Sequence, residues 1–371
     1  MKLEDIDKNF KEQGELKSSG LKTYNVINPP FRVYGVYYDE KNGFMRLPEN
    51  TVPSSLGVSK LAHECAGGRI KFSTDSNVFG IHVRYKRFYD MAHMPRTGCS
   101  GFVLLDETDA KIKHVSTFRV AFDEKSSFDK YTYAPDENCK VELNSSCTLK
   151  GDRVRDYLLF MPLYAGVQSI EITLSENAKI GSGREYLPNK RVLYYGSSIT
   201  QGGCASRPDN AYQGHISKWT NTDFINLGFS GNAKGEKEMA EYLASVDCNV
   251  FVCDYDHNEI TASDLKEKHY NFYKAYRKVN PSTPILFVSR PNSDKCEDLK
   301  ERIAIIKNTV RKAKKQGDNN VYFLSGEHFF GKTAEEREVC TMDCTHPNDL
   351  GFYYMAVAIR KALIKIDQVY K

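Results

Sequence analysis

The sequence has no long apolar run and almost no charge imbalance. Its 371 residues include 52 Lys and Arg against 48 Asp and Glu, a net charge of +4, and these charges are interspersed. A basic cluster of the kind that binds nucleic acid is missing, and no stretch approaches the roughly 18 apolar residues of a membrane-spanning helix. We therefore expect neither a nucleic acid nor a membrane as a partner.

Secretory and disulfide features are also scarce. Residues 1–20 are charged and polar throughout, without the apolar segment of a secretory leader. We therefore expect a soluble cytoplasmic protein, the alternative being a chain from which a leader has been removed. The ten cysteines are scattered, and several lie in apolar strand-like runs, as Cys248 and Cys253 do. Such cysteines are typically reduced and buried.

Internal repeats and low-complexity segments are absent as well, and the length exceeds that of a typical single domain. In the first half, alternating strand-like patterns rich in β-branched and aromatic residues are separated by turn residues. This pattern predicts a jelly-roll β-sandwich over residues 1–178, a fold that could bind carbohydrate. The expected strands are Phe31–Tyr38, Arg69–Ser73, Val78–Tyr85, Gly101–Leu105, Val115–Phe122, Tyr157–Pro162 and Ser169–Leu174, with turns at Asp39–Gly43, Asp75–Asn77 and Asp136–Asn138.

The pattern changes after Ser175–Lys190, a polar segment that we interpret as a linker. Beyond it, short apolar strands alternate with helical patterns, which predicts an α/β domain over residues 185–371 with a parallel sheet between layers of helices. Strands are expected at Arg191–Tyr195, Phe224–Leu227, Asn249–Cys253, Pro284–Val288 and Asn320–Leu324. Helices are expected to begin near Ala211 and to cover Lys234–Ser245, Asp264–Lys278, Leu299–Lys315 and Leu350–Asp367.

Ser198 follows the first of these strands and Gly196, which places its hydroxyl at the carboxyl edge of the sheet, where open α/β folds bind ligands. A serine hydroxyl needs a base to become a nucleophile. His346 is the candidate base, and Asp343, three residues earlier, could orient its ring and stabilise the imidazolium. Taken alone, each of these motifs is also typical of an ordinary turn or a capping loop.

Cys340, Cys344 and His346 raise the alternative of a zinc site. A fourth ligand at metal spacing is missing, so we favour the nucleophile–base interpretation of this segment. That chemistry requires no metal and no organic cofactor.

An acyl-transfer site also needs donors for the oxygen of the tetrahedral intermediate. Three candidates are the amide of Ser198, the amide of Gly231 after the second strand, and the side-chain NH₂ of Asn258 after the third. The alternatives are a plain strand–helix turn for Gly231 and an Asx-turn or helix cap for Asn258.

With these residues, the chain resembles the SGNH (GDSL-type) hydrolase superfamily over roughly Arg191–Tyr370. The resemblance implies a flavodoxin-like three-layer fold, Ser198 as nucleophile, Gly231 and Asn258 in the oxyanion hole, and Asp343 and His346 as acid and base. Two positions depart from the family pattern. Ser197 replaces the usual Asp, and the segment 256–259 replaces the usual Gly-x-Asn-Asp, so His257 could act in place of Asn258.

The segments 196–207 and 226–232 resemble more specifically the branch with an N-terminal β-sandwich, which includes bacterial carbohydrate O-acetylesterases such as the family 17 mannan acetylesterases. The resemblance implies a serine esterase that deacetylates plant-derived, mannan- or xylan-type oligosaccharides. Alternatives are a general small-acyl esterase, lipase or thioesterase, and a non-catalytic carbohydrate-binding protein. An acetylated oligosaccharide is the expected partner, and a homo-oligomer remains open.

Several polar and aromatic residues could hold such a substrate. Arg207 and Tyr212 follow the nucleophile closely, and His257 lies beside Asn258. A sandwich loop carrying Tyr85, Arg87, Tyr89 and the stretch Met91–Arg96 could also face the cleft. For all of these, packing in the core or exposure at the surface is the competing interpretation.

Overall fold

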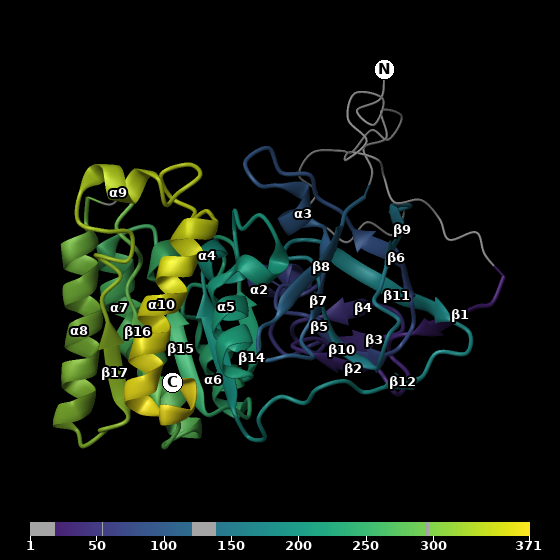
Figure 1. The fold of residues 1–371 in the computed structure, drawn as a ribbon. Helices are drawn as coiled ribbons and strands as arrows, with labels where there is room; N and C mark the ends of the chain where they lie inside the picture. The colour runs from purple at the N-terminus through teal and green to yellow at the C-terminus, as the bar shows by residue number, and fades with distance from the viewer. Residues whose placement is uncertain (1–18, 54, 121–138, 294–296) are drawn as a thin grey trace.

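Two antiparallel sheets form the N-terminal half of the computed structural model, which describes residues 19–53, 55–120, 139–293 and 297–371 (Figure 1). One sheet has the strand order β1-β11-β6-β9, and the other has the order β12-β5-β10-β7-β8, with β2 also paired to β5. The strands are β1 (Leu21–Asn25), β2 (Arg32–Tyr34), β5 (Arg69–Thr74), β6 (Val78–Arg87), β7 (Phe102–Asp106), β8 (Lys113–Phe118), β9 (Glu142–Thr148), β10 (Arg155–Phe160), β11 (Gly166–Ser175) and β12 (Ile180–Gly181).

The predicted jelly-roll sandwich is confirmed, and its core lies between the inward-facing side chains of the two sheets. Phe72 of β5 stacks on Phe79 of β6 with ring centroids 5.9 Å apart. The expected strand Phe31–Tyr38 is wrong as a single element. It breaks at Gly35, which has φ +77°, into β2 and β3 (Tyr37–Asp39). β3 then pairs with β4 (Gly43–Met45) across the predicted turn.

Other local differences in this half concern short or polar segments. Strands β1, β9 and β12 were not expected, nor were the helices α2 (Gly57–Leu61) and α3 (Arg96–Cys99). The expected turn at 136–138 and the last two residues of the expected strand 115–122 lie outside the described residues. No disulfide joins any of the nine cysteines that the structure describes.

The C-terminal half contains a five-stranded parallel sheet of order β14-β13-β15-β16-β17. The sequence predicted all five strands, because each is a buried apolar run between turn residues. Their bounds are β13 (Arg191–Gly196), β14 (Asp223–Gly228), β15 (Val250–Asp254), β16 (Ile285–Val288) and β17 (Val321–Leu324).

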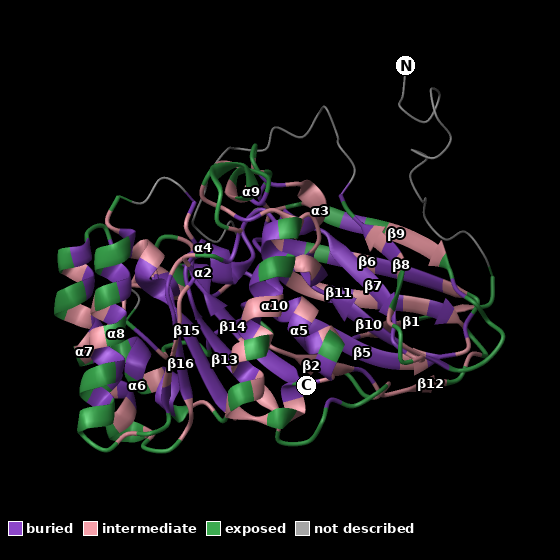
Figure 2. Ribbon diagram, turned by 60° about the vertical axis from the view of Figure 1, so that its left-hand side comes forward, coloured by how far each residue is buried: buried purple, intermediate pink, exposed green. Residues whose placement is uncertain are grey.

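Helices cover both faces of this sheet, as predicted, and burial is concentrated where helix and sheet meet (Figure 2). Alternate strand residues such as Tyr194 and Val252 pack towards α5 and α10, while Leu193 and Phe251 pack on the opposite face towards α6, α7 and α8. The helices are α4 (Ser198–Gln201), α5 (Tyr212–Thr220), α6 (Lys237–Ser245), α7 (Ala262–Val279), α8 (Leu299–Lys315), α9 (Ala334–Glu338) and α10 (Asp349–Ile366). No helix in the described part of the chain is long and apolar enough to cross a membrane.

The strand order reverses at β13, which lies between β14 and β15. Chains leaving these strands diverge, and the carboxyl edge at such a reversal is where open α/β sheets bind ligands. The loops after β13, β14 and β15 carry Ser198, Gly231 and Asn258 respectively. The fold therefore gathers three of the predicted site residues at one edge.

The sandwich packs against β14, the edge strand of the parallel sheet (Figure 1). Arg69 of β5 is fully buried and donates to the Asp223 carboxylate at 2.6 Å and to the Phe224 carbonyl at 2.8 Å. Its guanidinium carbon also lies 3.6 Å from the centre of the Phe224 ring. An edge strand that would otherwise offer unpaired backbone groups is thereby covered by the other domain.

Candidate active site

The turn from β13 into α4 presents Ser198 at the edge of the sheet. A Cβ on Gly196 would lie 1.6 Å from Oδ1 of Asp254 and 2.1 Å from Oγ1 of Thr200, so no side chain fits there. Ser197, which replaces the family's usual Asp, caps α4 by accepting a hydrogen bond from the amide of Ile199 at 3.2 Å. The departure at this position therefore preserves a side-chain cap.

Ser198, His346 and Asp343 form one hydrogen-bonded chain. Oγ of Ser198 lies 3.0 Å from Nε2 of His346, and Nδ1 of His346 lies 2.8 Å from Oδ2 of Asp343. A carboxylate at Nδ1 selects the tautomer with its proton there, which leaves Nε2 to accept the proton of the serine. The geometry fits a nucleophile, a base and an orienting acid, as the sequence predicts.

Asp343 is held in its ionised form by donors. Partial burial by itself would raise its pKa, but hydrogen bonds from the backbone amide and ring of His346 and from the amide of Thr345 lower the pKa below its ordinary value. Oδ1 of Asp343 accepts from the His346 amide at 2.7 Å and from the Thr345 amide at 3.0 Å. An ionised carboxylate is what stabilises an imidazolium during attack.

The loop that carries His346 is fixed to α10. Asn348 is the N-cap of this helix, and its side chain accepts from the amides of Leu350 and Gly351 at 3.0 and 3.1 Å. The Met342 amide donates to the His346 carbonyl at 2.9 Å. This cap holds the loop that carries the base in place.

Gly231 lies in the loop after β14 with φ +66°, and a Cβ built on it would meet nothing within 4 Å. It lines the same cavity as Ser198 and His346. Its amide has no hydrogen-bond acceptor among the described residues. Donation by the amides of Ser198 and Gly231 to an oxyanion stays a prediction.

Asn258 is placed differently from the expectation. It ends the 3₁₀ turn Tyr255–Asn258, and its side-chain NH₂ donates to the carbonyls of Phe229 and Ala233 at 3.0 and 3.1 Å. Both hydrogens of the amide are thus used to brace the loop that contains Gly231. Direct donation by Asn258 to the oxyanion stays a prediction.

A cavity of about 790 Å³ adjoins Ser198 and His346. His257, Arg290 and Arg302 line it, and Ile260 is the one large aliphatic side chain among the described lining residues. Burial first, and then the positive charge of Arg290, lower the pKa of His257 to about 3. His257 is therefore a neutral hydrogen-bonding group in the cavity. It lies beside the site, and its contact with a substrate stays a prediction.

Of two predicted substrate contacts, Tyr212 is wrong, while contact with a substrate by Arg207 stays a prediction. Tyr212 is fully buried, and its hydroxyl donates to Oδ2 of Asp254 at 3.2 Å beneath the nucleophile, so it cannot touch a substrate. Arg207 pairs with Asp209, with 3.2 Å between Nε and Oδ1, and lines a second cavity of about 850 Å³ beside Trp219. The prediction for Tyr212 rested on its closeness to Ser198 in the sequence, but Tyr212 lies on the side of α5 that faces the core.

The prediction that a sandwich loop faces the cleft is wrong for three of its residues. Tyr85, Arg87 and Tyr89 are buried, with Tyr85 donating to the Ser100 carbonyl at 2.5 Å and Arg87 to the Lys60 carbonyl at 2.9 Å. His93, within the expected stretch 91–96, does reach the site, with its ring centre 5.7 Å from that of His346.

Within the described part of the chain, one group of side chains could bind a metal ion. Ligand atoms of His93, Cys204 and His346 lie within 4.8 Å of one another. Both ring nitrogens of His346 are already engaged by Ser198 and Asp343, so an ion bound there would break the serine–histidine hydrogen bond. Among the described residues, neither Cys340 nor Cys344 belongs to this group.

No sequence pattern indicated the residues that lie behind the site. Gln201 contacts Glu64, which is 137 positions away in the other domain. Thr200 and Tyr212 contact the buried Asp254. Such contacts depend on the packing of elements that are distant in the sequence, so no local sequence pattern predicts them.

Two family models match the chain. The GDSL-like lipase/acylhydrolase family matches residues 189–364, and the N-terminus of the SGNH-hydrolase-type esterases matches residues 21–180. No curated protein sequence matches the chain.

Solved structures with the same fold span both halves. A Bacteroides ovatus protein described as a GDSL-like lipase is 27% identical with a TM-score of 0.77, covering 94% of this chain and 98% of its own. The salicylyl-acyltransferase SsfX3 from a tetracycline biosynthetic pathway is 17% identical with a TM-score of 0.74, covering 95% and 100%. An acetyl xylan esterase from Butyrivibrio proteoclasticus is 13% identical with a TM-score of 0.60, covering 95% and 100%.

Proposed function

Because this chain belongs to the SGNH (GDSL-type) hydrolases and is a serine ester hydrolase, we propose that it removes O-acetyl groups from plant-derived oligosaccharides of the mannan or xylan type. The observation that carries the proposal is the hydrogen-bonded chain from Ser198 through His346 to Asp343 at the wall of a polar cavity. Carbohydrate esterases that share this fold add support for the substrate class.

In the proposed reaction, Oγ of Ser198 attacks the acetyl carbonyl while Nε2 of His346 takes its proton. The carbonyl oxygen becomes an oxyanion that accepts hydrogen bonds from the amides of Ser198 and Gly231. The sugar hydroxyl then leaves with the proton from His346, and Ser198 remains acetylated. Water, deprotonated by His346, attacks the acetyl-serine, and acetate leaves as the serine regains its proton.

The cavity lining favours a small acyl group on a hydroxyl-rich alcohol. Among the described residues that line it, His257, Arg290 and Arg302 offer polar contacts, and only Ile260 is a large aliphatic group. A long acyl chain gains binding energy only where an extended apolar surface removes it from water. An acetyl group does not need such a surface.

Acetate release from acetylated manno-, xylo- and cello-oligosaccharides, followed by mass loss per acetyl group, tests the proposal. Ser198→Ala should abolish release while the fold is retained. Ser245→Ala, at the exposed end of α6, is a matched control that should keep full activity. A preference for long acyl chains on nitrophenyl esters would overturn the choice of acetyl, and activity on none of the oligosaccharides would overturn the choice of sugar.

A further inference from the structure

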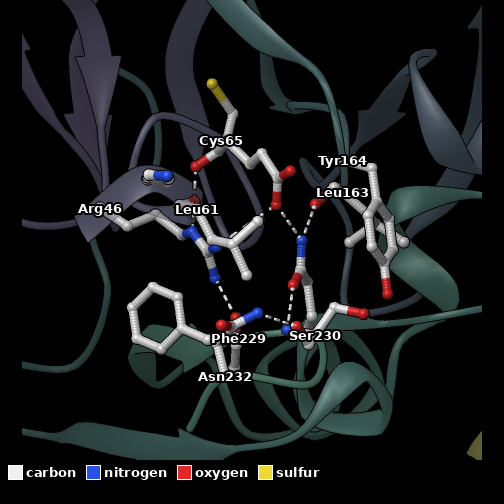
Figure 3. Close-up of polar contacts among 12 residues, drawn as sticks. Arg46, Leu61, Cys65, Leu163, Tyr164, Phe229, Ser230 and Asn232 are labelled. Atoms are coloured by element: carbon white, nitrogen blue, oxygen red, sulfur yellow. Dashed lines mark hydrogen bonds and ion pairs between the residues drawn. The ribbon is translucent and has the colours of Figure 1, made fainter. Parts of the chain in front are cut away.

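One glutamine joins the two domains at the active site. Nε2 of Gln201, the last residue of α4, donates to Oε2 of Glu64 and, at 3.2 Å, to the carbonyl of Leu163, both from the sandwich (Figure 3). Its Oε1 accepts from the backbone amide of Ser230 at 3.0 Å. A side chain in the sandwich is therefore connected to the residue that precedes Gly231.

The Ser230–Asn232 segment, between the buried Phe229 and Ala233, is held by several side-chain hydrogen bonds. The space on the Cα side of Gly231 is open, since nothing would lie within 4 Å of a Cβ built there. Gln201 binds the amide of Ser230, and the side chain of Asn232 donates to the Ser230 carbonyl at 2.6 Å. Asn258 donates to the flanking carbonyls of Phe229 and Ala233. Losing one of these bonds should let the Gly231 amide turn away from Ser198.

Glu64 is almost fully buried, at 1% exposure, and is compensated by Arg46 with 3.6 Å between Oε2 and Nη2. Arg46 also donates to the carbonyl of Gly228 at the end of β14, and its guanidinium lies 4.5 Å from the ring centre of Phe229. A buried carboxylate without such partners would be costly. Arg46, labelled in Figure 3, thus contacts the end of the strand that enters the loop, and its partner Glu64 contacts Gln201.

We propose that Glu64 is a positioning residue for ester hydrolysis, which acts through Gln201 to hold the Ser230–Gly231 peptide with its Gly231 amide facing the oxyanion at Ser198. The sandwich then completes the catalytic domain in addition to any contact it makes with a glycan. This inference rests on the oxyanion role proposed for Gly231 and is independent of the identity of the sugar.

Hydrolysis of nitrophenyl acetate by Glu64→Met, Glu64→Gln and Gln201→Met tests the proposal. Loss of one direct oxyanion donor typically lowers kcat by about 10²–10³, so loss of its support should lower kcat by about tenfold or more. We expect this for Glu64→Met and Gln201→Met, with KM within about twofold. Glu64→Gln keeps an acceptor for Gln201 and should restore most of kcat.

Two further readouts separate positioning from stability. A boronic acid that forms a tetrahedral adduct with Ser198 should bind the methionine variants more weakly, in proportion to the fall in kcat. Glu64→Met combined with Gln201→Met should lose little more than either alone, because both act on one contact. Glu107→Met is the matched control, since Glu107 is a sandwich carboxylate at 2% exposure that pairs with Lys71. It should lose stability but keep kcat.

Unchanged kcat in folded Glu64→Met and Gln201→Met, or an equal fall in Glu107→Met, would overturn the inference. If Glu64→Met does not fold, Gln201→Met alone decides by the same criteria. Activity that survives in Ser198→Ala would instead refute the proposed mechanism, so the two failures are distinguishable.

Discussion

Asp343 holds His346 through two separate atoms of the histidine. One carboxylate oxygen accepts from ring Nδ1 at 2.8 Å, and the other accepts from the backbone amide at 2.7 Å. The first bond sets the tautomer and the second fixes the loop, so the carboxylate defines both the chemistry and the position of the base.

Asp343→Asn should therefore lower kcat by about 10³–10⁴, the range known for loss of the carboxylate in serine triads. An amide at this position no longer stabilises the imidazolium and can favour the wrong tautomer. The measurement is kcat on nitrophenyl acetate, with circular dichroism to check the fold. A fall of less than about tenfold would show that another group orients His346.

Asn258→Ala should lower both stability and kcat, because the variant removes the side-chain hydrogen bonds to the carbonyls of Phe229 and Ala233, and the Ala233 carbonyl loses its donor. A buried acceptor left unsatisfied costs about 1–3 kcal/mol. Thermal unfolding and kcat measured on the same samples check this. A fall in kcat with no loss of stability would favour the direct oxyanion role predicted from the sequence.

Tyr212→Phe removes a hydroxyl that donates to the buried Asp254 and should reduce stability by about 1 kcal/mol. Because Tyr212 does not reach the cavity, KM for acetylated oligosaccharides should stay unchanged. A large rise in KM with unchanged stability would restore Tyr212 as a substrate contact.

Stability should fall as pH rises from about 6.5 to 8. Burial raises the pKa of Asp254 to about 8 and that of Glu64 to about 7, well above their values in an unfolded chain. In this window the folded state binds more protons than the unfolded state, so raising the pH favours unfolding.

Below about pH 6.5 the buried histidines oppose this trend. Burial lowers the pKa of His63 and His215 to about 4 and of His257 and His269 to about 3, so there the unfolded state gains the extra protons. Asp254→Asn should flatten the decline between pH 6.5 and 8, as followed by the thermal midpoint. An unchanged slope in that variant would contradict a raised Asp254 pKa.

The sequence predicted the parallel sheet well, because its strands are buried on both faces and read as continuous apolar runs. Leu299–Lys315 is reproduced to the residue as α8. Strands β1 and β9 were missed because their residues are mostly polar and partly exposed, leaving little alternation to detect.

The site was predictable only where its residues follow strands or form compact motifs. Ser198, Asp343 and His346 met that condition, and their hydrogen-bonded arrangement agrees with it. Glu64 did not, because its contact with Gln201 arises only when the two domains dock. The sequence also does not show which side of a helix faces the core. Tyr212 was assigned to the substrate site for that reason.

Labelling with a serine-reactive organophosphorus probe, followed by peptide mapping, tests the central claim most directly. The account predicts one equivalent of label per chain, located on Ser198, no label in Ser198→Ala and greatly slowed labelling in His346→Ala. A wild-type chain that remains unlabelled, or equal labelling of Ser198→Ala, would contradict it.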